Sequence, residues 1–115
     1  MEIKELQKLI VKFRDARDWK QFHNPKDLAL SLTLEAAEVL EHFQWKSKEE
    51  ISALPKTKEF ADLKEEVVDI LYWILLISHD LNIDLEKEFS AKMKKNEEKY
   101  PVEKARGSHK KYTEL

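Results

Sequence analysis

Two segments of the chain repeat one pattern, in which two acidic residues stand three positions apart among aliphatic side chains. The first segment holds Glu35 and Glu38, and the second holds Glu66 and Asp69. On an α-helix, positions i and i+3 share a face, so each segment points two carboxylates in one direction. The aliphatic neighbours favour burial against another element. The pattern therefore predicts a helix pair across which four carboxylates face each other.

Such a group of carboxylates is unfavourable unless protons or cations neutralise it. Two carboxylates about 4 Å apart repel each other by roughly 4 kcal/mol at an effective dielectric constant of about 20. Sites built only from carboxylate oxygens suit Mg²⁺, Mn²⁺ or Ca²⁺, whereas zinc and iron sites usually include His or Cys. We therefore interpret the four acids as ligands of a divalent cation, with Mg²⁺ as the first choice.

The simpler alternative is that these acids belong to solvated helix faces, since 23 of the 115 residues are Asp or Glu. The positions of the flanking apolar residues argue against it. Glu35 and Glu38 lie beside the apolar stripe of their segment rather than opposite it. Asp69 stands between Val68 and Ile70, next to a long hydrophobic run, where a purely solvated acid is unexpected. We favour the metal site over the solvated face.

The composition predicts a helical protein. The chain has one Gly, three Pro and 38% charged residues, which is unlike a sheet protein with many tight turns. We expect a single all-α domain over residues 1–115, of which residues 102–115 form an irregular tail. The absence of cysteine excludes disulfides, thiol catalysis and thiolate metal sites. It also suits a reducing compartment, and we expect a cytoplasmic protein.

Neither a membrane nor a nucleic-acid polymer is expected as a partner. The longest apolar run, residues 70–77, is far shorter than the about 20 residues that a membrane span requires. The first residues contain acids and no apolar core of a secretory signal. A formal net charge of -2 gives no overall attraction to DNA or RNA.

Apolar periodicity and capping residues predict the helices. The expected N-caps are Asn24 before Pro25, Ser47 in a capping box, Thr57 and Asp84. The helices are expected at residues 3–13, 25–43, 48–54, 58–79 and 85–99. The second half of the segment 58–79 is apolar nearly all round, which a surface helix of a small monomer would not tolerate, so we expect an oligomer.

Basic and aromatic residues form two further groups with ligand-binding potential. Lys92, Asn96 and Tyr100 recur every fourth residue on one helix face, which suits a phosphate path but is also typical of a solvated helix. The tail residues suited to closing over an anion are Arg106, Lys111 and Tyr112. Aromatic side chains on which a base can stack, or which can simply pack in a core or an interface, are Trp19, Phe22, Trp45 and Trp73, with His23 beside them.

Several enzyme classes are excluded or disfavoured by the same residues. One glycine cannot build a Gly-rich phosphate loop or a dinucleotide-binding motif. A ferritin-like di-iron site needs Glu-x-x-His on each of two helices, whereas this chain has Glu-x-x-Glu and Glu-x-x-Asp. His42 follows Glu38 by four residues, which is the wrong spacing for that motif.

The motifs also occur in a characteristic order. They are DWKQFHNP at residues 18–25, EAAEVLE at 35–41, FQW at 43–45, EEVVD at 65–69, Lys92-Met93, Asn96, Tyr100-Pro101 and KYTEL at 111–115. Each piece alone is weak, but their order and spacing together are specific. In this respect the chain resembles the MazG-like all-α nucleoside triphosphate pyrophosphohydrolases, and most closely their dCTP-hydrolysing branch.

The resemblance implies a four-helix bundle that binds a nucleoside triphosphate with Mg²⁺, for which Mn²⁺ can substitute. Water would attack the α-phosphorus, and the products would be the monophosphate and pyrophosphate. By carry-over, the metal ligands are Glu35, Glu38, Glu66 and Asp69. Glu41, one turn after Glu38, would support the metal or the attacking water, so that Glu38 and Glu41 are the catalytic pair.

The resemblance also assigns substrate-binding residues and an assembly. The base pocket would be formed by Trp19, Phe22, His23 and Trp45. The phosphates would be held by Lys92, Asn96, Tyr100, Arg106, Lys111 and Tyr112, some of them from a neighbouring subunit. Trp73 stands where the dCTP-hydrolysing branch has a tyrosine, with Tyr72 one position earlier, which leaves the base or sugar preference open. The branch is typically tetrameric, and a dimer is the alternative assembly.

The sequence thus predicts a Mg²⁺-dependent nucleotide pyrophosphatase that acts on dCTP or a modified pyrimidine nucleotide and controls the nucleotide pool. The alternative is a non-catalytic helical oligomerisation or adaptor module. In that alternative, the acids form a solvated face and the aromatic residues form an interface.

Overall fold

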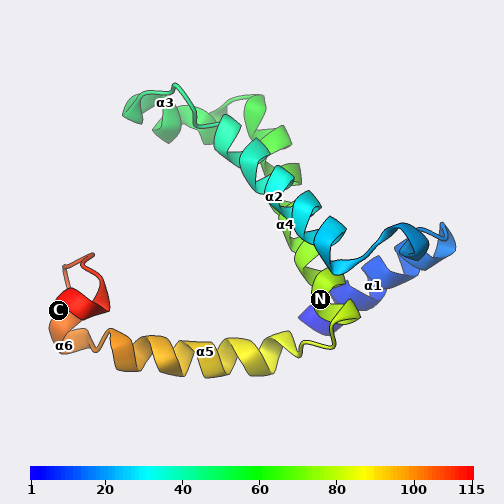
Figure 1. Ribbon diagram of the computed structural model, residues 1–115. Coiled ribbons are helices and arrows are strands. Elements are labelled where there is room, and N and C mark those ends of the chain that lie inside the picture. The colour runs from blue at the N-terminus through cyan, green and yellow to red at the C-terminus, as the bar shows by residue number, and fades with distance from the viewer. The chain divides into compact units, whose positions relative to one another are not determined.

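The computed structural model describes residues 1–115, and the chain is helical throughout with no β-strand (Figure 1). The expected all-α class is confirmed. The α-helices are α1 (Ile3–Ala16), α2 (Pro25–Glu41), α3 (Lys48–Ala53), α4 (Glu59–Asp80), α5 (Leu85–Lys99) and α6 (Val102–Ala105). The 3₁₀ turns are η1 (Lys20–Phe22), η2 (Leu54–Lys56) and η3 (Tyr112–Glu114). The chain divides into two units, Met1–Asn82 and Ile83–Leu115.

In the first unit, α2 lies along α4, and α1 packs on the C-terminal half of α4 (Figure 1). The core is small. Its fully buried members are Leu28 of α2, with 1% of its surface exposed, and Leu75 and Leu76 of α4, with 1% and 0% exposed. Leu54 and Leu63 extend this core toward the start of α4. The helix pair that carries the two acidic segments is therefore held together by leucine packing.

Replacing Leu76 by alanine is expected to lower the free energy of unfolding by about 2–5 kcal/mol, because it leaves a cavity in this core. Urea denaturation followed by circular dichroism measures the change. Leu9→Ala is a control on α1, because Leu9 is 61% exposed. Equal losses in the two variants would contradict the central position of Leu76.

Three of the four expected N-caps are confirmed. Asn24 Oδ1 accepts a hydrogen bond of 2.9 Å from the backbone N–H of Asp27, and Pro25 occupies the first helical position. Ser47 and Glu50 form the capping box of α3. Asp84 caps α5 by accepting from the N–H of Lys87.

The fourth cap, Thr57, was wrong. Its hydroxyl donates instead to the carbonyl of Leu54 at 2.7 Å, at the end of η2, and α4 begins after Lys58 without a side-chain cap. The hydroxyl meets this carbonyl because Pro55 lies inside a 3₁₀ turn that brings Leu54 within reach. A local competing acceptor therefore displaced the expected cap.

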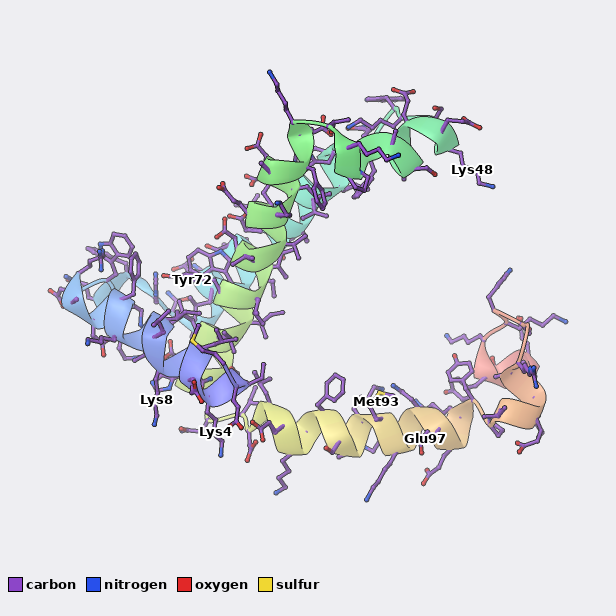
Figure 2. All side chains as sticks on the ribbon, turned by 180° about the vertical axis from the view of Figure 1, so that it is seen from behind. Lys4, Lys8, Lys48, Tyr72, Met93 and Glu97 are labelled. Carbon is purple, nitrogen blue, oxygen red and sulfur yellow. The ribbon has the colours of Figure 1, made fainter.

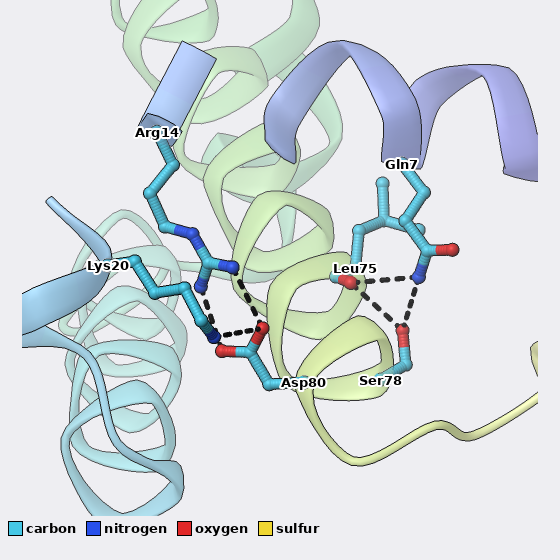
Figure 3. A network of polar contacts seen from close by, with 6 residues as sticks. All are labelled: Gln7, Arg14, Lys20, Leu75, Ser78 and Asp80. Carbon is cyan, nitrogen blue, oxygen red and sulfur yellow. Dashed lines mark hydrogen bonds and ion pairs between the residues drawn. The ribbon is translucent and has the colours of Figure 1, made fainter. Parts of the chain in front are cut away.

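A polar network joins α1 to the last turns of α4 (Figure 3). Arg14, which is 0% exposed, makes two hydrogen bonds of 2.8 Å to the carboxylate of Asp80. Lys20 adds a contact of 3.3 Å to the same carboxylate. Two turns earlier on α1, Gln7 donates to the carbonyl of Leu75 and to the hydroxyl of Ser78, both at 3.0 Å. The network fixes α1 against α4 at two separate points.

The second unit contains α5, α6 and η3. Tyr100 and Tyr112 pack edge to face with ring centroids 6.0 Å apart, and the ammonium of Lys99 lies 4.9 Å from the ring of Tyr112. Residues 102–115, expected to be irregular, are so only in part. The carbonyl of Pro101 accepts the N–H groups of Lys104 and Ala105, which closes the single turn of α6. Of all the helices, none has both the length and the apolar character needed to cross a membrane.

Candidate active site

The structure brings the two acidic segments together on the facing helices α2 and α4. Glu35 is half-buried, and its Oε2 atom is buried without a hydrogen-bond partner. Burial raises the pKa of Glu35, and the negative charges of Glu38, Asp69 and Glu66 raise it further. These causes require the other three carboxylates to lie near Glu35. Glu35 thus lies within electrostatic range of the other three acids.

The remaining acids of this group differ in exposure. Glu66 is half-buried, whereas Glu38 and Asp69 are exposed. Beside Asp69 is an open hollow of about 320 Å³, which is lined by Lys64, Glu65, Val68 and Asp69. Glu41, the last residue of α2, is exposed. Asp69 therefore borders an open hollow, whose lining includes none of the other three acids of the group.

The donor chemistry of this group fits a hard divalent cation. All four side chains offer carboxylate oxygens only, which is the set that Mg²⁺ prefers. The buried, unpartnered Oε2 of Glu35 is an atom that a cation would satisfy. No group of three or more Asp, Glu or His side chains is arranged to hold a metal ion.

His42, for which no role was predicted, contacts this group of acids. His42, directly after α2, bonds through Nε2 to Oε2 of Glu66, and its Nδ1 lies 3.3 Å from Oε2 of Glu59. Lys46 bonds both to the carboxylate of Glu59 and to the carbonyl of His42. Burial lowers the pKa of His42, but the hydrogen bonds to Glu66 and Glu59 outweigh it and raise the pKa above its ordinary value.

The signal that could have revealed this contact was its helical spacing. His42 follows Glu38 by four residues and Glu35 by seven, and therefore shares their face at the end of α2. Because this spacing differs from the Glu-x-x-His of a di-iron site, no role was predicted for His42.

An aromatic cluster lies where α1, η1 and α4 meet. His23 and Trp73 pack edge to face with centroids 5.7 Å apart, and Trp73 packs on Tyr72 at 4.9 Å. Phe13 connects Tyr72 to Trp19, with centroid separations of 6.4 and 5.7 Å. Figure 2 shows Tyr72 projecting from α4 beside α1. The structure thus joins Trp19 and His23 of the predicted base pocket with Trp73, and adds Phe13 and Tyr72, which were not predicted to lie there.

His23 is electrostatically distinct within this cluster. Burial lowers its pKa, and the positive charge of Arg14 lowers it further. Its Nδ1 atom is buried and has no hydrogen-bond partner. A neutral imidazole with a free nitrogen at the edge of an aromatic cluster is suited to hydrogen bonding with a planar ligand.

Two other predicted base-pocket residues lie outside this cluster. Phe22 is 66% exposed and Trp45 is 92% exposed, and neither stacks on another ring. Trp45 has a φ angle of +67°, which is uncommon for a bulky residue. The backbone turn after α2 therefore presents this indole to solvent.

The predicted phosphate-binding residues all belong to the second unit. Lys92 and Asn96 are on α5, Tyr100 directly follows it, and Arg106 follows α6. Lys111 and Tyr112 lie at η3, where Tyr112 packs against Tyr100. Within this unit, the contact between Tyr112 and Tyr100 therefore brings the end of the tail close to the end of α5.

The comparisons with known proteins agree with this helical, acid-lined architecture. The sequence pattern of the MazG-like family matches residues 30–115. The chain is 39% identical over 114 residues to dCTP pyrophosphatase 1 of Rattus norvegicus, covering 98% of this chain and 67% of the relative. It is 40% identical over 115 residues to dCTP pyrophosphatase 1 of Mus musculus, with the same two coverages of 98% and 67%.

A solved structure also matches. A pyrophosphatase from Archaeoglobus fulgidus superposes with a TM-score of 0.78 at 37% identity, over 85% of this chain and 91% of that chain. The fold is thus that of an all-α pyrophosphatase-like protein. The chain belongs to the MazG-like family.

Proposed function

We propose that this chain is a Mg²⁺-dependent nucleotide pyrophosphatase. It hydrolyses a nucleoside triphosphate, with dCTP or a modified pyrimidine nucleotide as the preferred substrate, to the monophosphate and pyrophosphate. The observation that carries the proposal is the packing of α2, which holds Glu35 and Glu38, along α4, which holds Glu66 and Asp69. The raised pKa of Glu35 is consistent with this arrangement. The names of its relatives, dCTP pyrophosphatase 1, support the choice of substrate.

In this proposal, Glu35, Glu38, Glu66 and Asp69 hold Mg²⁺. When bound, the cation offsets phosphate charge and lowers the pKa of water, the two requirements of phosphoanhydride hydrolysis. Glu38 and Glu41 orient the attacking water, and a carboxylate oxygen of this pair accepts its proton as the water oxygen bonds to the α-phosphorus. The bond between the α-phosphorus and the bridging oxygen breaks, and pyrophosphate leaves.

The proposed substrate contacts fall into two groups, one for the base and one for the phosphates. His23, Trp19 and Trp73 form the wall on which the base packs. Phe22 and Trp45 lie outside their cluster and are proposed as further base contacts. The groups proposed to bind the phosphates are Lys92, Asn96, Tyr100, Arg106, Lys111 and Tyr112. The family match supports treating residues 1–115 as one functional domain, because the matched segment crosses the boundary between the units.

We further propose that the chain forms a four-helix bundle within a homo-oligomer, with a tetramer as the expected state. Large apolar side chains of the helix pair are exposed, namely Leu30, Leu34, Leu40, Val67 and Val68. Contact with further copies would remove this apolar surface from water. Light scattering coupled to size-exclusion chromatography measures the assembly, and a monomer at micromolar concentration would contradict it.

The experiment that tests the function is a panel of nucleoside triphosphates assayed for pyrophosphate release with and without Mg²⁺. We expect dCTP or a 5-modified dCTP to be hydrolysed fastest, with dCMP or its analogue as the product. EDTA should abolish the reaction, and Mn²⁺ should restore it. A protein that oligomerises but releases no pyrophosphate from any member would support the adaptor alternative instead.

His23→Ala is expected to raise the KM for dCTP by about tenfold with a smaller change in kcat, because it removes a hydrogen-bonding group from the base wall. Steady-state kinetics with dCTP measure both constants. His79→Ala is the matched control, since His79 is an exposed residue near the end of α4. An unchanged KM in His23→Ala would remove His23 from the base pocket.

A further inference from the structure

We propose that His42 is a positioning residue for Glu66, holding its carboxylate in the orientation in which it binds the cation. The inference rests on the proposed function, in which Glu66 is one of the Mg²⁺ ligands. It adds a residue that neither the paired-acid pattern nor the family resemblance assigns to the site.

The contact between the two side chains leaves part of Glu66 available. His42 engages Oε2 of Glu66, and the second oxygen, Oε1, is not used by this contact. His42 is 13% exposed and Glu66 is 22% exposed, so the pair is mostly shielded from water. A shielded hydrogen bond to one oxygen limits the rotation of the carboxylate and leaves the other oxygen free for a ligand.

His42 is itself held from its other side. Its Nδ1 faces the carboxylate of Glu59 at 3.3 Å. Lys46, which is 22% exposed, bonds that carboxylate and the carbonyl of His42. The imidazole ring is therefore anchored at both nitrogens, and Glu66 receives a fixed partner rather than a mobile one. Part of the entropy cost of ordering Glu66 is met when the protein folds and not when the cation binds.

A purely structural role makes a different prediction. The same cluster connects the end of α2 to the first half of α4, so it could serve only to join the two helices. In that case, removing any member would weaken the fold, and cation affinity would not depend on which member was removed. Positioning requires that the loss be specific to the residue that touches Glu66.

The test compares His42→Ala, His42→Gln and Lys46→Met with the wild-type protein. Lys46→Met is the matched control, because it removes a positively charged side chain from the same cluster, and Lys46 does not contact Glu66. The first measurement is the Mn²⁺ affinity of the nucleotide-free protein by electron paramagnetic resonance. The second is the Mg²⁺ concentration that gives half-maximal pyrophosphate release, and thermal melting by circular dichroism reports folding.

We expect His42→Ala to weaken cation binding by about tenfold or more in both measurements, as is usual for residues that orient a metal ligand. His42→Gln, which keeps a hydrogen-bond donor, should recover part of the loss. Lys46→Met, which leaves the hydrogen bond between His42 and Glu66 in place, should lose markedly less cation affinity than His42→Ala. If His42→Ala unfolds, the folded His42→Gln variant carries the test through an affinity between those of wild type and Glu66→Gln.

Two results would overturn the assignment of His42 alone: wild-type affinity in a folded His42 variant, or equal losses in the His42 and Lys46 variants. A wild-type protein that neither binds Mn²⁺ nor releases pyrophosphate would instead overturn the proposed function, and this inference with it. The two failures are therefore distinguished by the wild-type measurement.

Discussion

Asp69→Asn and Glu38→Gln are each expected to abolish pyrophosphate release from dCTP, with a loss of at least about a hundredfold in kcat. Each change replaces one charged ligand by a neutral amide of the same shape, so the cation loses a partner while packing is preserved. Both side chains are exposed, and the helical circular dichroism signal should therefore survive. Initial rates at saturating Mg²⁺ and dCTP measure the effect.

The matched control for this pair is Glu49→Gln. Glu49 is an exposed acid in the first turn of α3, and the capping box of that helix uses Glu50. The control should retain wild-type activity. Full activity in either Asp69→Asn or Glu38→Gln would reject the role of that residue as a ligand.

Asp80→Asn is expected to lower the free energy of unfolding by about 3–5 kcal/mol, the usual cost of removing one partner of a buried ion pair. Arg14 is 0% exposed, and Asp80 is 9% exposed. The substitution leaves the guanidinium buried without its counter-charge. Lys20→Met is the control, because Lys20 is 60% exposed and a solvated partner contributes only about 0–1 kcal/mol.

The same ion pair predicts how this difference changes with pH. The hydrogen bonds from Arg14 hold the pKa of Asp80 below its ordinary value of 3.8. The stability that they provide is therefore present above that value and is lost as the pH falls through the lowered pKa of the folded state. Urea midpoints measured between neutral pH and about pH 3 should show wild type and Asp80→Asn converging under acid. A constant difference would contradict the assignment.

The parts of the fold that the sequence predicted depend on signals within a few residues. Asn24 and Asp84 cap their helices through backbone groups three positions away, and Ser47 does the same within its capping box. The prediction for Thr57 was wrong because its hydroxyl donates to the carbonyl of Leu54, three positions earlier, and does not accept from an N–H group of α4. The ion pair between Arg14 and Asp80 was not predicted, because its partners are 66 positions apart and no periodicity marks them.

In the candidate site too, features set by nearby residues were predicted, and contacts between distant residues were not. Spacing of i and i+3 indicated which acids share a helix face, and the repeated pattern indicated the helix pair. The contact of His42 with Glu66 depends on how α2 and α4 align along their length. That alignment could not be predicted from residue spacing within either helix. Likewise, Trp45 and Trp73 were grouped by residue type, but the structure packs Trp73 on His23 and leaves Trp45 exposed.

The two attachment points of α1 also determine the position of the proposed base wall. Gln7 and Arg14 are seven residues apart, and both hold the last turns of α4. Sliding α1 by one helical turn would move it about 5.4 Å and break both attachments together. The loop that carries His23 follows α1 directly, and His23 packs on Trp73 of α4, so a shift of α1 would also displace this contact. Discrimination between bases of different size would then depend on a base-binding surface of fixed position rather than on one that adapts to each ligand.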